Sequence, residues 1–227
     1  MAGRTRSDWQ EAHQPRLSDL AYERILESLF ERRVPVGAFV SQGELSALID
    51  IPIAPLRDAL RVLEAEGILS IHPRSGIEFV RPGLELTRAT YQFRSILERA
   101  AVRVFAEQGG EALFETLWQR HAAMIARIER DGLSGNWPQE MDELETLLHG
   151  SSIAALSNPL IEKSYRRIHN YLRLLRLERK LTSPLALRTL REHLEIIEAC
   201  RSRNADRAEA ALQDHFRAAI ERNLGMI

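Results

Sequence analysis

The sequence lacks the features that would place it in a membrane or outside the cell. Cys200 is its only cysteine, so the chain can form neither an internal disulfide nor a zinc site built from several thiolates. No run of 18 apolar residues occurs, and the first residues lack the apolar stretch of a secretory signal. We therefore expect a cytoplasmic protein with no membrane partner, beginning with a flexible segment over residues 1–16.

An excess of charge of either sign is also absent. The 31 Lys and Arg residues nearly cancel the 32 Asp and Glu residues, so no overall field draws the chain to nucleic acid or to an anionic membrane. Any charged partner must therefore meet a local patch. A hydrophobic content of 44% in 227 residues excludes a disordered or fibrous protein and allows one large domain or two ordinary ones.

The pattern of the sequence changes at residues 80–83, which read Val-Arg-Pro-Gly. Before this point, helical periodicity alternates with short apolar runs that are typical of strands. After it, only helical periodicity continues. We predict one domain over residues 17–82 and a second, helical domain over residues 83–227.

The first domain begins with three predicted helices, over residues 18–33, 42–49 and 53–66. Ser18 is the expected N-cap of the first. Ser41 and Glu44 have the spacing of a capping box at the start of the second. In the third, three leucines form the expected buried stripe: Leu56, Leu60 and Leu63.

Two short apolar runs, ILSIH and IEFV, follow and flank a Pro-Arg-Ser-Gly turn, which predicts a β-hairpin. Helices followed by a hairpin in this order indicate a winged helix-turn-helix, whose last helix enters the DNA major groove. Arg57 and Arg61 lie on that helix away from the leucines, and Arg74 lies at the hairpin tip. Solvated arginines without a partner are the simpler alternative for any one pair.

Residues 17–80 resemble the DNA-binding domain of the GntR family of bacterial transcription regulators. The resemblance rests on three segments: LSDLAYERILESL, SQGELSALIDIPIAPLRDALRVLEAEGIL and HPRSGIEFV. It implies that Arg57 is the recognition-helix arginine and that Arg74 and Gly76 form the wing contact. Arg61, which lies four residues after Arg57 on the same helix, and Ser41 are our further candidates for contact with DNA.

The sequence departs from the GntR pattern at two places. Gly43 stands where family members usually carry an arginine, and Pro52-Ile53 stands where they carry a Ser-Arg pair. Two cationic DNA contacts are therefore missing. We expect the operator sequence to differ from the usual one.

The second domain has six predicted helices, over residues 86–108, 111–130, 138–156, 159–180, 185–202 and 205–223. Glycine, proline and asparagine residues separate them, and the short connections indicate an antiparallel bundle. The predicted fold class is thus mainly α, with an N-terminal winged helix-turn-helix and a C-terminal six-helix antiparallel bundle.

Three histidines of the second domain stand in unusual surroundings. His149 follows Glu145 by four residues, which puts both side chains on one helix face. His193 and His215 lie on apolar stripes of later helices. A lone histidine in such a stripe is usually a hydrogen-bonded core residue, whereas three with a carboxylate suit a borderline divalent cation such as Zn²⁺ or Ni²⁺.

The same residues carry a second resemblance, over residues 86–223. ETLLH with SNPL, EHLEIIEAC and DHFRAAI resemble the FCD ligand-binding domain of the FadR-like branch, and six helices indicate its VanR-type subgroup. The resemblance implies a metal set, with Glu in place of the usual Asp: Glu145, His149, His193 and His215. Zinc is the metal that we expect, and nickel is the alternative.

The resemblance also implies an effector contact at Arg94. This arginine lies on an inward stripe, so its charge needs an anion, either an effector carboxylate or Glu98 one turn later. Polar residues of the YRRIHNYLR segment are further candidates for the same pocket: His169, Asn170 and Arg173.

These observations predict a homodimeric regulator, which binds a palindromic operator and is a repressor released by a small carboxylated metabolite. A metal-dependent, hydrolase-like enzyme is one alternative, although the sequence shows no further inward-facing general base near the metal set. A metabolite-sensing dimer that has lost DNA binding is the other. The departures at Gly43, Pro52 and Ile53 favour it.

Overall fold

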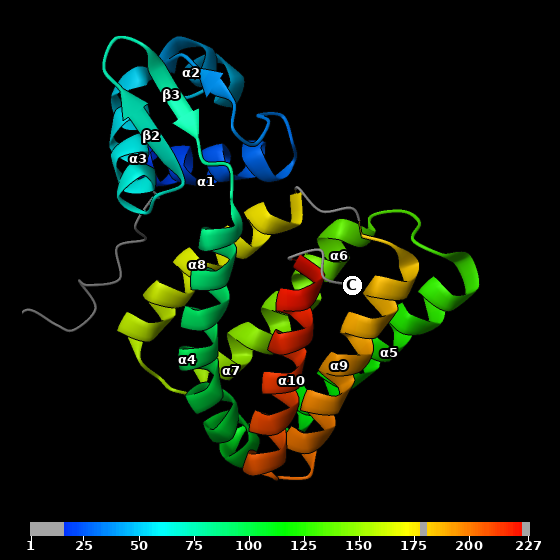
Figure 1. Cartoon of the computed structure of the whole chain (residues 1–227). Coiled ribbons are helices and arrows are strands. Elements are labelled where there is room, and N and C mark those ends of the chain that lie inside the picture. The colour runs from blue at the N-terminus through cyan, green and yellow to red at the C-terminus, as the bar shows by residue number, and fades with distance from the viewer. Residues whose placement is uncertain (1–15, 178–180, 224–227) are drawn as a thin grey trace, which may run out of the picture. The chain divides into compact units, whose positions relative to one another are not determined.

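A computed structural model describes residues 16–177 and 181–223 of the chain (Figure 1). The chain divides into two compact units, one ending at Arg81 and the other beginning at Pro82, and each is treated by itself. The flexible segment expected over residues 1–16 lies outside the described residues, apart from Arg16. The same is true of the end of the helix predicted over residues 159–180. Within the described ranges, no helix is long and apolar enough to cross a membrane.

The first unit is a winged helix-turn-helix, as predicted. Its elements in chain order are α1 (Leu17–Phe30), β1 (Phe39–Val40), α2 (Gln42–Ile49), α3 (Ile53–Ala65), β2 (Leu69–His72) and β3 (Gly76–Phe79). The three strands form an antiparallel sheet in the order β1-β3-β2. Strand β1 was not predicted, because two residues are too few to show an alternating pattern.

Local sequence signals explain most of the boundaries in this unit. Ser41 caps α2, since its hydroxyl accepts from the Glu44 N–H and the Glu44 carboxylate accepts from the Ser41 N–H. The prediction that Ser18 is the N-cap of α1 is wrong, because the N-cap is Arg16, two residues earlier. Arg16 has the extended backbone of an N-cap, and its carbonyl accepts from the N–H groups of Asp19 and Leu20. Ser18 therefore lies inside the first turn.

The predicted leucine stripe of α3 forms the core of the unit. Leu56, Leu60 and Leu63 are all fully buried, and α3 packs on α1. This leaves the opposite face of α3, with Arg57 and Arg61, in solvent.

The second unit is a helical bundle, as predicted. Its elements are α4 (Leu84–Gln108), α5 (Glu111–Asp131), α6 (Trp137–Glu145), a π-helical turn (Thr146–Gly150), α7 (Ser151–Ala154), α8 (Pro159–Leu177), α9 (Ser183–Arg201) and α10 (Ala205–Asn223). Helix α10 packs against both α4 and α9, and α9 packs in turn against α5 (Figure 1). Residues 138–156 do not form one regular helix, because the π-helical turn separates α6 from α7.

Most of this bundle encloses an apolar core. Phe105 and Phe114 meet edge to face in this core, with ring centroids 4.9 Å apart. Against this background a group of buried polar side chains stands out between α4, the π-helical turn, α9 and α10. Buried polar groups need partners, so this group is where a function of the unit is most readily sought.

Candidate metal centre and DNA-binding face

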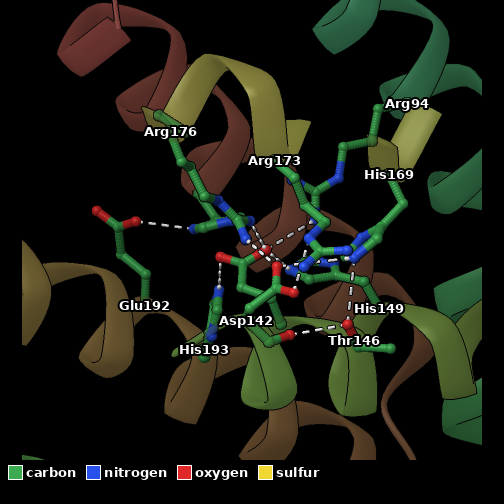
Figure 2. Close-up of polar contacts among 12 residues, drawn as sticks. Arg94, Asp142, Thr146, His149, His169, Arg173, Arg176, Glu192 and His193 are labelled. Carbon is green, nitrogen blue, oxygen red and sulfur yellow. Dashed lines mark hydrogen bonds and ion pairs between the residues drawn. The ribbon is translucent and has the colours of Figure 1, made fainter. Parts of the chain in front are cut away.

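The four predicted metal ligands meet at one place in the bundle. One ligand atom from each residue lies within 4.8 Å of the other three, and all four side chains are buried. Glu145 ends α6, His149 lies in the π-helical turn, His193 is on α9 and His215 is on α10. Side chains from separate helices thus converge on one place. Figure 2 shows His149 and His193 there.

The π-helical turn is part of the centre. It begins directly after Glu145 and contains His149, whose Nε2 atom lies 3.7 Å from Oε2 of Glu145. Such wide turns inside α-helices are rare and occur frequently at functional sites. No composition signal in the sequence predicts one here, so its presence is a finding of the structure alone.

One hydrogen bond fixes the outer ring nitrogen, Nδ1, of each of the three histidines. Nδ1 of His149 lies 2.6 Å from Oε2 of Glu98, and Nδ1 of His215 lies 2.8 Å from Oε2 of Glu192. Nδ1 of His193 lies 3.2 Å from Nε2 of His121. In each ring the outer nitrogen is thereby engaged, and Nε2 is left for the centre.

Those three Nε2 atoms are the clearest sign that the centre suits a metal ion. Within the described part of the chain, none of them has a hydrogen-bond partner, although all are buried. Buried nitrogen atoms without a partner are costly, and a cation between them would satisfy all three at once. Four ligand atoms about 2.1 Å from a tetrahedral ion lie about 3.4 Å apart, so a separation of 4.8 Å would have to shorten by about 1.4 Å when the ion binds.

The protonation states also suit a metal. Burial lowers the pKa of His193 well below its usual value and lowers that of His215 too, so both rings are neutral near pH 7. Burial alone would raise the pKa of Glu145, but nearby positive charge, that of Arg176 above all, outweighs it and holds that pKa well below its usual range. Neutral imidazoles and an ionised carboxylate are the forms that bind cations.

Two guanidinium groups flank the carboxylate of Glu145. Nη2 of Arg176 lies 2.6 Å from Oε2 of Glu145, and Nη2 of Arg94 lies 3.5 Å from the same oxygen (Figure 2). Arg94 also donates from Nε to Oε1 of Glu98 over 2.5 Å, so the carboxylate anticipated as its structural partner is indeed in place. The Nη2 atom of Arg94 nevertheless has no hydrogen-bond partner among the described residues, although it is buried.

The other candidate effector residues lie on α8. His169 approaches Oγ1 of Thr146, and Arg173 pairs with Asp142 over 3.0 Å (Figure 2). Asn170 is buried on the same helix. Sequence reasoning missed Asp142 and Arg176, which link these residues to the metal set: Arg176 contacts both Asp142 and Glu145.

The groups that surround the histidines were not predicted in that role. No further general base was expected near the set, yet Glu192 and His121 contact it, and so does Glu98, which was expected only as a partner of Arg94. These groups have further hydrogen-bond partners of their own. Arg222, for example, donates to both carboxylate oxygens of Glu192. His121 could have been found, because it shares a buried helix face with Leu117 and Met124, whereas Glu192 gives no such signal.

The expected DNA-binding residues lie in the first unit, where the arginines are exposed and Ser41 caps a helix. Arg57, Arg61 and Arg74 are exposed, and Arg57 donates from Nε to Oε1 of Gln42 over 2.9 Å. Ser41 is occupied by its capping box.

Gly76 has a structural reason to be glycine. Its φ is +136°, and a Cβ atom there would lie 2.7 Å from the carbonyl oxygen of Val40. It therefore allows β1 to pair closely with the wing. The three exposed arginines remain candidates for DNA contact.

Comparison with known proteins agrees with this architecture. A family model described as bacterial regulatory proteins, gntR family, matches residues 17–79, and one described as FCD domain matches residues 89–218, more than half of the chain. The chain has an FCD domain, preceded by a helix-turn-helix domain of the GntR family. Family members are transcription regulators that bind operator DNA and are typically dimers. The alternative of a hydrolase-like enzyme is therefore not supported.

Individual relatives are distant. The HTH-type transcriptional regulator YdhC of Bacillus subtilis is 20% identical over 195 residues, which cover 86% of this chain and 85% of YdhC. BphR of Paraburkholderia xenovorans is 22% identical over 218 residues, covering 93% and 87%. Both are named as HTH-type transcriptional regulators.

Solved structures share the fold. A GntR regulator from Rhodococcus sp. RHA1 aligns with a TM-score of 0.76 at 17% identity, and E. coli McbR/YncC with 0.77 at 14%; each alignment covers 92% of this chain and 98% of the other. The metal-free FCD domain of TM0439 aligns over 64% of this chain and 99% of its own length, with a TM-score of 0.51 at 22% identity.

Proposed function

We propose that this GntR regulator holds a divalent metal in its FCD domain and represses transcription until a small carboxylate binds beside that metal. The observation that carries the proposal is the set of three buried, unpartnered Nε2 atoms facing Glu145. A purely structural cluster of histidines would pair these atoms with one another or with carboxylates. Here the pairing partners occupy the outer nitrogens instead.

The donor set favours zinc, with nickel as the alternative. Three imidazole nitrogens and one carboxylate oxygen suit a cation of borderline softness, and the single cysteine of the chain, Cys200, is not in the set. When bound, such an ion supplies positive charge and coordination positions for an anion. Glu145, His149, His193 and His215 are the residues that would hold it.

Arg94 makes a carboxylate the favoured effector. Its buried Nη2 atom has no hydrogen-bond partner in residues 16–177 and 181–223, and it lies 3.5 Å from a carboxylate oxygen of the metal set. A small carboxylate next to the ion could accept from this atom, and a charge-assisted bond of this kind is short and strong. His169, Asn170 and Arg173 on α8 are the further residues that we assign to effector binding.

A homodimer would present two recognition helices to a palindromic operator. Helix α4 carries exposed apolar side chains at helical spacing, including Phe93 (44% exposed) and Ile96 (64%). We assign this face to the dimer interface, because apolar side chains of this size gain most from being covered. The domains would span residues 17–82 and 83–227, and the bundle favours the VanR-type subgroup of the FadR-like branch.

Metal analysis of protein purified without chelators tests the centre. We expect about one ion per chain in the parent protein and a sharp loss of metal in His215→Ala, because removal of one of four ligands weakens the chelate. His72→Ala is the matched control, since His72 lies on the wing in the other unit. If the parent protein takes up neither zinc nor nickel, the three histidines are structural residues of the bundle core and not metal ligands.

Selection from random DNA followed by titration tests the regulatory part. The selected duplex should be palindromic, and acetate, lactate or succinate serve as probes of a carboxylate effector. Weaker DNA binding in the presence of a probe, only when metal is bound, supports the proposal. A protein that selects no DNA while still binding metal would instead be a sensing dimer without DNA binding.

A further inference from the structure

His121 is a buried histidine that lies next to the metal set without belonging to it. It is on α5, its side chain is fully buried, and its ring centroid lies 5.3 Å from that of His193. Its two ring nitrogens have different partners: Nδ1 lies 2.7 Å from the carbonyl oxygen of Leu117, and Nε2 lies 3.2 Å from Nδ1 of His193.

These contacts determine which nitrogen of each ring carries the proton. The Leu117 carbonyl can only accept, so Nδ1 of His121 must be the N–H group. Nε2 of a neutral His121 is then an acceptor, and Nδ1 of His193 must donate to it. The Nε2 atom of His193 is therefore free of hydrogen and presents its lone pair to Glu145 and the other two histidines.

His193 differs in this respect from the other two metal-ligating histidines. His149 and His215 donate from Nδ1 to the carboxylates of Glu98 and Glu192. Helix α9 faces α5 at His193, and α5 offers an imidazole there in place of a carboxylate. The hydrogen bond through the outer nitrogen is the usual device by which a protein fixes the ligating tautomer of histidine.

We propose that His121 is a positioning residue for the metal centre, which holds His193 in the tautomer and ring orientation that ligate through Nε2. The inference rests on the metal centre of the proposed function. His121 does not itself ligate, because its Nε2 atom faces the outer nitrogen of His193. Without it, the Nδ1–H group of His193 would be buried without an acceptor.

Substitutions at His121 separate positioning from packing. His121→Leu fills the space but offers no acceptor, whereas His121→Gln keeps an acceptor oxygen on a side chain of similar size. Met124→Leu is the matched control, because Met124 is buried one turn away on the same helix face and packs in an apolar cluster. All three are made in the full chain.

Zinc affinity, measured by competition with a chromophoric chelator, is the first readout. We expect His121→Leu to bind zinc about 10- to 100-fold more weakly than the parent protein. Binding by His121→Gln should stay within about threefold of the parent, and Met124→Leu should not change it. A folded His121→Leu with the parent's zinc affinity, or a folded His121→Gln as weak as His121→Leu, would overturn the proposal.

The tautomer of His193 is the second readout and needs neither metal nor variants. Nitrogen-15 NMR of histidine-labelled, metal-free parent protein should show His193 protonated at Nδ1 and His121 also protonated at Nδ1. Protonation of His193 at Nε2 would overturn the proposal even if zinc binds. If the parent binds no zinc but shows the expected tautomers, the proposed function fails and His121 has no metal centre to serve, although its hydrogen bond still fixes the tautomer of His193.

Discussion

Nε of Arg94 donates to Oε1 of Glu98 over 2.5 Å, and both side chains are almost fully buried. The other oxygen of Glu98 accepts from Nδ1 of His149 over 2.6 Å. One carboxylate on α4 therefore joins the proposed effector contact to a proposed metal ligand. We therefore expect a change at Arg94 or at His149 to affect the other residue through Glu98.

Glu98→Gln should weaken both the fold and the metal centre. An amide has one acceptor oxygen, so its NH₂ group must face one of the two donors, and the charge of Arg94 loses its closest partner. We expect the free energy of unfolding of the metal-free protein to fall by about 3–5 kcal/mol. Zinc affinity should fall about 10- to 100-fold.

Urea unfolding and chelator competition measure these two effects. Glu143→Gln is the control, because Glu143 pairs with Arg120 on the surface, where such a pair contributes about 0–1 kcal/mol. Equal unfolding midpoints for Glu98→Gln and Glu143→Gln would contradict the shared role of Glu98.

The helix-turn-helix could be predicted because its signals are local. A capping box at Ser41 and Glu44 and a leucine stripe in α3 each act within a few residues of sequence. Strand β1 could not, since its two residues gain their structure only from pairing with β3. The π-helical turn, Thr146–Gly150, likewise has no local signal and depends on packing within the bundle.

The metal set could be predicted in part. The spacing of Glu145 and His149 and the apolar surroundings of His193 and His215 are visible in sequence, and the structure brings all four together. The outer contacts are not visible, because Glu192 looks like any polar residue on a helix. It becomes a partner of His215 only when α9 packs on α10.

Arg57→Ala should reduce specific operator binding and leave the fold intact. Arg57 is exposed on α3, and its Nε donates to Gln42 on α2, which restrains the guanidinium at the surface. An arginine–guanine pair contributes about 1–3 kcal/mol for each half-site. Fluorescence anisotropy at fixed salt should therefore show much weaker binding of the selected duplex.

Arg33→Ala is the control for lost charge alone, because Arg33 pairs with Glu31 in the same unit. Non-specific DNA binding should fall similarly in both variants, since each removes one cation. If Arg57→Ala and Arg33→Ala bind the operator equally well, Arg57 does not contact the bases.

Ile96→Asp should convert the dimer to a monomer. Ile96 is 64% exposed on α4, and a carboxylate in the centre of an apolar interface would have to lose its water without gaining a partner. Sedimentation equilibrium should show half the mass of the parent assembly, and operator affinity should fall because the two recognition helices are no longer joined. Leu17→Asp, at an exposed residue in the other unit, should remain dimeric; a dimeric Ile96→Asp would move the interface elsewhere.

Two glycines of the first unit should respond to alanine in opposite directions. At Gly76, φ is +136° and a Cβ atom would lie 2.7 Å from the Val40 carbonyl oxygen, so Gly76→Ala should destabilise the unit by about 1–3 kcal/mol. Gly43 lies inside α2, where the nearest atom to a new Cβ is Oγ of Ser41 at 3.9 Å. Gly43→Ala should therefore stabilise the unit by about 0.5–1 kcal/mol.

Hydrogen exchange locates the damage that Gly76→Ala should cause. The Phe79 N–H donates to the Ala38 carbonyl oxygen over 2.9 Å where β3 meets β1, and it should exchange faster once the two strands are forced apart. The Leu56 N–H, which donates to the Pro52 carbonyl at the start of α3, should keep its protection relative to global unfolding. Unchanged exchange at Phe79 would mean that the wing accommodates the methyl group without moving. The close approach to Val40 would then not require a glycine at position 76.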